Sequence, residues 1–293
     1  MLTLLQIKYF YHLARTENIS QTARSLGISQ TSLSGMIVKL EESLGLPLFD
    51  RGKNTLRLNE AGKAFYPSAA AGIQALESGQ RAGLDVGKAE ITDINFAVRS
   101  TFVWQDLIIR FQKQHPEYQI RLFDRDFPDV RRMLTDGTVD LAIASKPEET
   151  DGLHYEPIAE NTVYLVVPAG HPLAQRESVC FNDIRNETFI QLSSKTGFAR
   201  HSRQLFREAG FTPRYVIECD YLMRASLVEA GFGVAITTSR GKASDLLAPN
   251  RYIPITDPFA TWQLYIVWNP GHYLSRAADR FRSYLLNDLN GKK

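Results

Sequence analysis

Residues 18–34 read NISQTARSLGISQTSLS, and this segment determines how the first 58 residues of the chain can fold. Ser20 can accept a backbone N–H at the start of one helix, and Gly27 can end that helix in the left-handed conformation. Ser29 can cap the next helix after only a short turn. The segment therefore predicts a helix-turn-helix.

The residues around this segment supply the apolar faces that a helical unit must bury. Ahead of it, apolar residues recur at helical spacing at Ile7, Phe10, Tyr11 and Ala14. In the helix that Ser29 begins, a second stripe is formed by Leu33, Ile37, Leu40 and Leu44, after which Gly45 can end the helix. Residues 47–49 and 55–58 then alternate around a turn at residues 51–54, which predicts a hairpin. Residues 1–58 are therefore interpreted as a winged helix-turn-helix.

The helix that follows the turn has a short polar face away from its apolar stripe. That face carries Gln30, Thr31, Ser34, Gly35 and Val38. Glutamine can bind adenine with two hydrogen bonds, serine and threonine can bond to several base edges, and a threonine methyl can contact a thymine methyl. The free N–H groups of the helix N-terminus can bind phosphate. The alternative is the water-facing surface of an ordinary helical bundle, because polar faces are common.

Residues 18–34 resemble the helix-turn-helix of the LysR-type transcriptional regulators, and residues 37–62 continue that family's order of residue types. The segments HPLA at residues 171–174 and LVEAGFGVAI at residues 227–236 also resemble the family. The resemblance implies DNA contacts at Ser29, Gln30, Thr31, Ser34 and Gly35 of the helix, and at Arg51 and Lys53 of the wing. The family usually has proline in place of Thr31 and arginine in place of Gly35, so one expected cationic contact is missing.

The expected wing is basic. Arg51, Lys53 and Arg57 lie within seven positions with no acid between them. The wing can therefore add phosphate contacts that make DNA binding sensitive to salt. A solvated hairpin tip is the alternative interpretation.

Residues 59–87 are interpreted as one long helix that needs a partner. Asn59 can cap it, and Glu60 begins a run that extends to about Leu84. Small and apolar residues recur along one side at Phe65, Ala69, Gly72, Leu76, Gly79 and Gly83. Pro67 removes a hydrogen bond or bends the helix, and the glycines lower its helix propensity. We therefore expect a dimerisation helix that packs against a second helix.

From residue 91 onward, short apolar strands alternate with helices, which favours an α/β domain with a parallel sheet. Expected strands are residues 94–98, 118–123, 139–144, 163–167, 189–192, 214–219, 234–237 and 264–267, and expected helices are residues 102–115, 128–136, 198–209, 221–230 and 273–286. We predict that residues 91–293 form two lobes, one of residues 91–162 with 268–293 and one of residues 163–267, with crossovers near the strands at 163–167 and 264–267. The expected fold is a multidomain α/β chain with an N-terminal winged helix-turn-helix, a long linker helix and a two-lobed α/β effector domain resembling periplasmic binding proteins.

Hydroxyl and aromatic residues follow several of these strands, where α/β domains bind ligands. Helix N-termini and hydroxyl groups together favour an anion such as a carboxylate. The residues expected to bind an effector between the lobes are Ser100, Thr101, Ser145, Ser193, Ser194, Thr196, Tyr221 and Thr237. Arg99 and Lys195 can add charge, and Phe102 and Trp104 can shape the pocket. An ordinary helix N-cap is the alternative for each serine and threonine.

The composition argues against several classes of protein. With a net charge of +2, any DNA-binding surface must be local, and no apolar run approaches the roughly 20 residues of a membrane span. The six histidines lack metal-ligand spacing and no P-loop or similar motif occurs, so we expect no metal and no cofactor. Cys180 and Cys219 are too few for a disulfide framework, and a redox switch between them is an alternative. Without a signal peptide, the expected location is the cytoplasm.

These features predict a sequence-specific DNA-binding transcription regulator that responds to a small molecule and is not an enzyme. The family resemblance implies a homodimer or homotetramer that binds double-stranded promoter or operator DNA and contacts RNA polymerase, with no membrane partner. Two alternatives concern the C-terminal half alone. A solute-binding protein would need an export signal and no helix-turn-helix, and an α/β enzyme would need a catalytic constellation that the sequence does not display.

Overall fold

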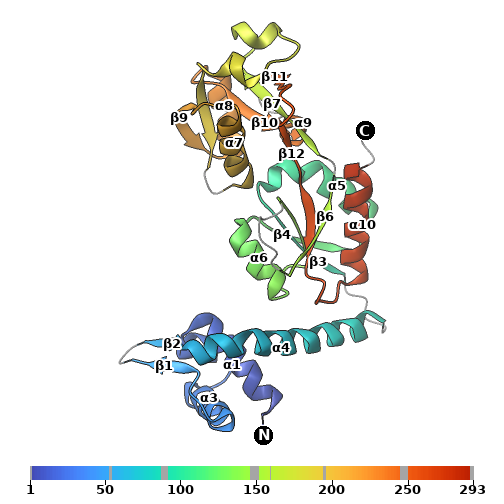
Figure 1. Ribbon diagram of the computed structural model, residues 1–293. Coiled ribbons are helices and arrows are strands. Elements are labelled where there is room, and N and C mark those ends of the chain that lie inside the picture. Colours follow the sequence, from blue (N-terminus) through green and yellow to red (C-terminus); the bar gives the residue numbers. More distant parts are fainter. Residues whose placement is uncertain are drawn as a thin grey trace. The chain divides into compact units, whose positions relative to one another are not determined.

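The computed structural model describes residues 2–52, 55–86, 92–145, 152–158, 160–193, 196–244 and 250–290. The chain divides into two compact units (Figure 1). Residues 1–90 with 271–273 form the first unit, and residues 91–270 with 274–293 form the second. Among the described helices, none has both the length and the hydropathy of a membrane-spanning segment.

The first unit is a winged helix-turn-helix followed by one long helix. Its elements are α1 (Leu4–Thr16), α2 (Ile19–Ser25), α3 (Gln30–Leu44), β1 (Phe49–Arg51), β2 (Leu56–Leu58) and α4 (Glu60–Val86). β1 and β2 pair antiparallel, which confirms the hairpin. Ser29 caps α3 and Gly45 ends it at φ 71°, as predicted, whereas the cap of α2 is Asn18 and not Ser20. Asn18 is the cap because its carboxamide oxygen accepts the N–H of Gln21 at 3.0 Å.

The core of the first unit joins the apolar stripes of α1 and α3 to the wing. Phe10, Leu33 and Leu40 are fully buried. The ring of Phe10 lies 5.7 Å from that of Phe49 and 5.2 Å from that of Phe65. Burial of each such side chain contributes about 1.5–3 kcal/mol. This packing holds α3 with its polar face outward and ties the wing to the helices.

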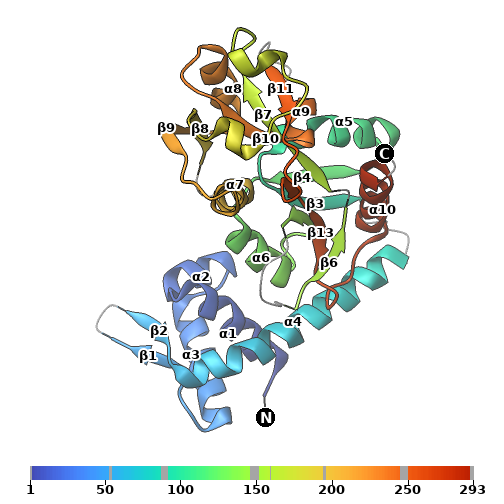
Figure 2. The same cartoon turned by 45° about the horizontal axis from the view of Figure 1, so that its top comes forward.

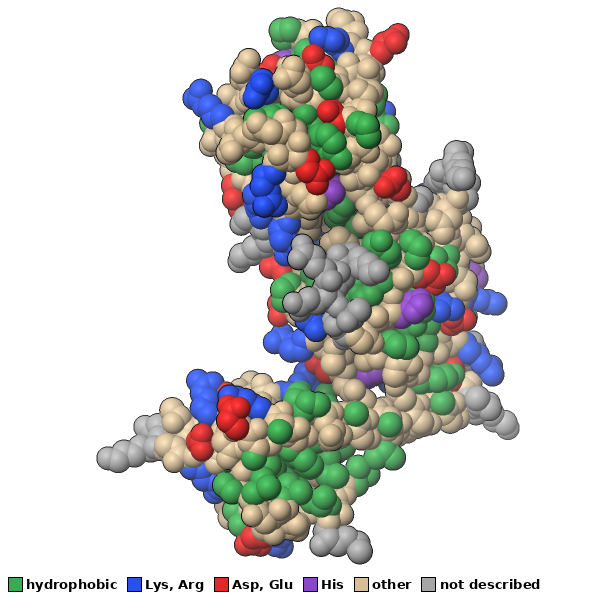
Figure 3. All heavy atoms as spheres, viewed as in Figure 1, with side chains coloured by type: hydrophobic (Ala, Val, Ile, Leu, Met, Phe, Trp, Pro, Cys, Tyr) green, Lys and Arg blue, Asp and Glu red, His purple; other side chains and the backbone are tan. Residues whose placement is uncertain are grey.

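Only the second half of α4 keeps the free apolar side that the sequence predicts. Phe65 and Ala69 pack into the core of the first unit, and Ile73 packs against α1. Leu76 and Leu84 are about half exposed. The expected seam is therefore wrong for its first part, because α1 of the same chain covers that side. Figure 3 shows hydrophobic side chains gathered over α1 and α4 on one face of this unit.

The first lobe of the second unit is a five-stranded sheet with helices on both faces. Its strands, in spatial order, are β4 (Gln119–Phe123), β3 (Asp93–Val98), β5 (Leu141–Ala144), β13 (Tyr265–Trp268) and β6 (His154–Pro157). β3 runs parallel to β4 and β5, which confirms the predicted parallel arrangement. Helices α5 (Gln105–Gln114) and α10 (Arg276–Asn290) pack on one face around Phe96, and α6 (Phe127–Thr135) packs on the other around Ala97 (Figures 1 and 2).

Several predicted boundaries in this lobe are wrong. Residues 264–267 were expected in the second lobe, but β13 lies in the first because its backbone pairs antiparallel with β5 and β6. The last helix begins at Arg276 and not at residue 273, because the hydroxyl of Ser275 accepts the N–H of Ala278 at 3.2 Å and caps the helix. The helix expected at residues 102–115 is divided into a 3-10 turn, Thr101–Trp104, and α5.

The second lobe is built around β7. β7 (Asn161–Val167) pairs antiparallel with β10 (Ala235–Thr238), β11 (Arg251–Pro254) and β12 (Thr261–Trp262). A separate parallel pair is formed by β8 (Thr188–Leu192) and β9 (Arg214–Cys219). Its helices are α7 (Gly197–Glu208), α8 (Tyr221–Glu229) and α9 (Ser239–Ser244), with 3-10 turns at Pro172–Gln175 and Phe181–Ile184. The chain enters this lobe between β6 and β7 and leaves it between β12 and β13, near the predicted crossovers. α7 follows the end of β8, and α9 follows the end of β10.

Candidate nucleic-acid interface and effector pocket

α3 presents an exposed polar face. Gln30, Thr31 and Gly35 are exposed and Ser34 is half-buried, while the opposite side of α3 is buried in the core. Apart from the neighbouring residues of α3 itself, no heavy atom of the described chain lies within 4 Å of the position that a Cβ would take at Gly35. Packing therefore does not prevent a larger side chain at this position. The fold would also accept the arginine that the family usually has here.

The side chain of Ser29 is engaged in capping α3. Its hydroxyl oxygen accepts the N–H of Ser32 at 3.1 Å, and its O–H donates to the Ser32 hydroxyl at 2.9 Å. Helix capping therefore accounts for the side chain of Ser29. The first turn of the helix still carries backbone N–H donors that lack an intrahelical acceptor and can bind an anion.

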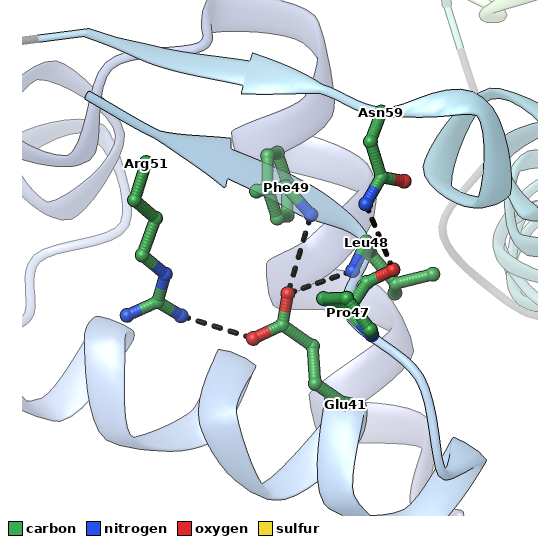
Figure 4. A network of polar contacts seen from close by, with 6 residues as sticks. All are labelled: Glu41, Pro47, Leu48, Phe49, Arg51 and Asn59. Atoms are coloured by element: carbon green, nitrogen blue, oxygen red, sulfur yellow. Dashed lines mark hydrogen bonds and ion pairs between the residues drawn. The ribbon is translucent and has the colours of Figure 1, made fainter.

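A carboxylate from α3 holds the first strand of the wing (Figure 4). Oε1 of Glu41 accepts the N–H groups of Leu48 at 2.8 Å and of Phe49 at 3.2 Å. Its Oε2 accepts a hydrogen bond from the Arg51 guanidinium at 3.0 Å. The Arg51 side chain is 51% exposed and that of Glu41 only 13%. Lys53, the other expected wing contact, lies outside the described residues.

A second carboxylate holds the other strand. Glu17 accepts the N–H of Leu58 at 2.9 Å and also pairs with Arg57. The backbone hydrogen bond, together with the Arg57 guanidinium, lowers the pKa of the Glu17 carboxyl below its ordinary value. Glu17 itself has φ 47°, a left-handed conformation that is unfavourable for a residue with a side chain.

The second unit contains a cavity of about 110 Å³ that both lobes line. A single water needs about 10–15 Å³ of such space, so the cavity can hold a small organic molecule. Uncharged lining residues include Ser100, Trp104 and Ser145 from the first lobe and Thr196, Phe198, Tyr221, Thr237 and Trp262 from the second. The cavity therefore lies at the ends of β3, β5, β8 and β10, where ligand binding was expected.

The structure brings most of the predicted effector residues together. Ser100, Ser145, Thr196, Tyr221 and Thr237 line the cavity. Thr101 and Ser193 are not among the lining residues, and Ser194 lies outside the described residues. Thr101 and Ser193 are direct neighbours of lining residues, Ser100 and Leu192. A position after a strand therefore does not distinguish a residue that lines the cavity from its neighbour that does not.

Ser100 and Thr196 use their hydroxyl groups differently. The Thr196 hydroxyl accepts the N–H of Ala199 at 3.0 Å and caps α7. Ser100 makes no capping hydrogen bond and has φ 58°. An ordinary helix cap therefore accounts for Thr196 and does not account for Ser100. A residue held in the left-handed conformation beside a cavity is typical of a binding site.

Guanidinium groups dominate the charge of the cavity. The charged lining residues that the structure describes are Arg99, Arg125, Arg200, Arg240 and Asp126. Arg99 lies 2.9 Å from Asp124 and 3.5 Å from Asp126. The Arg240 guanidinium lies over the Trp104 ring, 4.8 Å from its centroid, and burial lowers the pKa of Arg240. The wall is therefore cationic even after the Arg99 ion pairs are considered.

Three of these arginines are absent from the predicted set. Arg125 follows β4, Arg200 lies in the first turn of α7, and Arg240 lies in α9 directly after β10. Arg125 and Arg240 each follow the end of a strand closely, as the predicted hydroxyl residues do, whereas Arg200 lies inside a helix. The sequence gives each cation its position along the chain, and only the folded lobes bring the three cations to one cavity.

A fully buried arginine lies behind the wall of the cavity. Arg224 of α8 is 2% exposed, and it donates hydrogen bonds to the Ile236 carbonyl at 2.9 Å and the Thr237 hydroxyl at 3.1 Å. Its guanidinium lies 4.6 Å from the centroid of the Tyr221 ring. Two lining residues, Tyr221 and Thr237, are thus held by one buried cation.

Metal and redox chemistry receive no support from the described part of the chain. No cluster of His, Cys, Asp or Glu side chains in it is placed to hold a metal ion. Cys180 and Cys219 are both free thiols. Burial raises the pKa of Cys219, which disfavours the thiolate that a redox switch requires.

Two family models match the chain. The model for "Bacterial regulatory helix-turn-helix protein, lysR family" matches residues 4–63, and the model for "LysR substrate binding domain" matches residues 94–290. A relative from Bacillus subtilis, the uncharacterized helix-turn-helix-type transcriptional regulator YybE, is 28% identical over 290 residues, which cover 97% of this chain and 98% of the relative. The regulator CfxR of Cupriavidus necator is 28% identical over 295 residues, covering 97% and 91%. Both relatives are named as transcriptional regulators.

Solved structures show the same fold over the full length. A full-length OxyR variant from Pseudomonas aeruginosa superposes with a TM-score of 0.75 at 21% identity, covering 97% of this chain and 95% of the other. HinK, a LysR family transcriptional regulator from the same organism, superposes with a TM-score of 0.61 at 25% identity and covers 100% of both chains.

Proposed function

This chain belongs to the LysR family of DNA-binding transcriptional regulators with an effector-binding domain, and we propose that its effector is a small anion bound in the cavity of the second unit. The observation that carries the proposal is the charge of the cavity wall, with four guanidinium groups and one carboxylate among the described lining residues. Arg99 and Arg240 are half-buried and Arg125 and Arg200 are exposed, so the four cations line a wall that an anion can reach. A carboxylate can bind a guanidinium with two parallel hydrogen bonds.

Polar and flat apolar groups define the rest of this proposed effector. The proposed contacts are Ser100, Ser145, Thr196, Tyr221 and Thr237. The Thr237 oxygen already accepts from Arg224, so its O–H is suited to donate to a ligand acceptor. The rings of Trp104 and Trp262 offer flat surfaces to an apolar body. Together these features support a small carboxylate with an apolar part.

For the first unit, we propose that α3 enters the major groove of operator DNA. At the N-terminus of α3, the proposed contact is the backbone N–H groups that follow Ser29. The other proposed contacts of α3 are Gln30, Thr31, Ser34 and Gly35. Gln30 suits adenine, and Gly35 permits close approach of the backbone. Lys53 is the proposed phosphate contact of the wing. Arg51 is a separate case, because Glu41 already binds it.

We propose that the protein is a homodimer or homotetramer with the free part of α4 in the interface. Leu76 and Leu84 expose apolar surface there, and an added Cβ at Gly79 would meet no atom of the described chain within 4 Å outside the neighbouring residues of α4. Two DNA-binding units held in this way can bind two stretches of one promoter, where contact with RNA polymerase is proposed. An effector that binds one arrangement of the lobes more tightly shifts the equilibrium toward that arrangement.

Tryptophan fluorescence tests the effector proposal, because Trp104 and Trp262 line the cavity. A panel of small carboxylates is compared with the corresponding neutral amides. We expect a saturable change with at least one carboxylate, little change with its amide, and loss of the response in Arg240→Met. The matched control is Arg282→Met, because Arg282 lies over Trp268 at 4.7 Å outside the cavity. Equal responses to acid and amide contradict an anionic effector.

A further inference from the structure

Each strand of the wing is attached to the helices through one glutamate. Glu41, from α3, accepts two backbone N–H groups at the start of β1 and binds Arg51 (Figure 4). Glu17, at the end of α1, accepts the N–H of Leu58 in β2 and binds Arg57. The contacts are arranged in the same way on both strands. One carboxylate accepts hydrogen bonds from the backbone of the strand and neutralises the arginine of that strand.

The backbone conformation of Glu17 carries a cost that its side-chain contacts can offset. Glu17 ends α1 with φ 47°, in the conformation that favours glycine. The corresponding end of α3 has Gly45 at φ 71°. A glutamate at such a position is less favourable than glycine in its backbone conformation. Its carboxylate contacts with Leu58 and Arg57 are what glycine could not provide.

We propose that Glu17 and Glu41 form a carboxylate clamp that positions the wing and neutralises Arg51 and Arg57. The two arginines are then positioning residues and not phosphate contacts, which replaces the sequence-based assignment of Arg51 as a DNA contact. The clamp rests on the proposed DNA-binding role of the wing. It makes the contribution of the wing to phosphate binding smaller than the number of its cations indicates.

Glu41→Gln separates the positioning of the wing from the neutralisation of Arg51. The amide oxygen can still accept the two backbone N–H groups, but the amide NH₂ then faces the Arg51 guanidinium, and two donors cannot bond. Arg51, whose side chain is already 51% exposed, then lacks the carboxylate that neutralises it and can bind phosphate. For each DNA-binding unit, one added phosphate contact makes the log–log salt dependence steeper by about 0.9 and tightens binding by up to about eightfold at about 0.1 M salt.

The experiment measures fluorescence anisotropy of a labelled random-sequence duplex with the full chain over a range of salt concentrations. Glu42→Gln is the matched control. Glu42 is the adjacent exposed acid of α3, so this variant removes the same charge, but among the described residues Glu42 binds no arginine. In the double variant Glu41→Gln/Arg51→Met the gain must disappear, since no cation is left to release. Glu17→Gln tests the second carboxylate with Arg57, and it also covers the case in which Glu41→Gln does not fold.

Tighter binding and a steeper salt dependence in Glu41→Gln, absent from the control and from the double variant, support the clamp. An unchanged salt dependence overturns it. An equal gain in Glu42→Gln or in the double variant also overturns it, because the gain then comes from the lost negative charge and not from Arg51. In these cases the proposed DNA interface still stands. If the wild-type chain binds no duplex at low salt, the interface and the clamp fail together.

Discussion

Arg224 donates a hydrogen bond to the Thr237 hydroxyl at 3.1 Å, and both residues are buried. The contact places a cation directly behind the wall of the effector pocket. Arg224→Met removes this hydrogen bond and leaves the Ile236 carbonyl without its donor, so we expect the free energy of unfolding to fall by about 2–4 kcal/mol. Denaturant unfolding measures this change. A loss below about 0.5 kcal/mol, typical of surface substitutions, would show that Arg224 does not hold the wall.

Gly35 offers room for a cation on the exposed face of α3. Gly35→Arg replaces a helical glycine at an open position, which gains up to about 1 kcal/mol of stability, and adds a charge to the proposed DNA interface. We expect a higher unfolding midpoint and a salt dependence of DNA binding that is steeper by about 0.9. Gly35→Ala is the control, because it supplies the helix propensity without the charge. If both variants bind DNA alike, residue 35 does not face the duplex.

The helices of the first unit could be predicted because their signals are local. Ser29 caps α3 through a residue three positions away, and Asn59 accepts the N–H of Gly62 at 2.9 Å in the same way. The error at Ser20 shows the limit of such signals. Asn18 and Ser20 are both good caps, and the left-handed Glu17, which ends α1 one residue earlier, places Asn18 at the cap position.

The short strands and the cations of the pocket depend on distant parts of the chain. β6, β11 and β12 are each only a few residues long, and they exist through pairing with β13 or β7. The same pairing places β13 in the first lobe. Arg125, Arg200 and Arg240 likewise share a cavity only once both lobes have folded. Local patterns do not contain this information.

Ser100 combines a left-handed backbone with a position on the cavity wall. Ser100→Gly relieves the backbone strain and Ser100→Ala keeps it, while both remove the hydroxyl. We expect both variants to weaken binding of a responding carboxylate by about tenfold, the effect of one hydrogen bond to a charged group, and only the glycine variant to raise the unfolding midpoint. Fluorescence titration and thermal unfolding measure the two effects. Unchanged carboxylate binding in both variants would exclude Ser100 as a contact.

We expect His201 to make the stability of the protein depend on pH. Its ring stacks on Trp262, its Nε2 lies 2.6 Å from the Thr261 carbonyl oxygen, and burial lowers its pKa below the ordinary value of 6.5. The neutral ring therefore stabilises the fold above pH 6.5, and this contribution is lost as the pH falls toward the folded-state pKa. We expect the unfolding midpoint to drop between about pH 7 and about pH 5, and to drop less in His201→Gln.

His12 of the first unit also has a pKa lowered by burial, so part of the drop should persist in the His201→Gln variant. Thermal unfolding at both pH values measures the difference. An identical drop in wild type and variant would show that His201 makes no contribution.

The decisive measurement is the binding of the full chain to DNA from the region upstream of its own gene, followed by anisotropy in the presence of excess unrelated DNA. We predict that the wild-type protein resists the competitor, and that Gln30→Ala loses about 1–3 kcal/mol of discrimination with little change in its affinity for unrelated DNA. Equal loss of affinity for both DNAs would contradict the assignment of Gln30 to base recognition. Absence of binding even to unrelated DNA at low salt would contradict the proposed DNA interface itself.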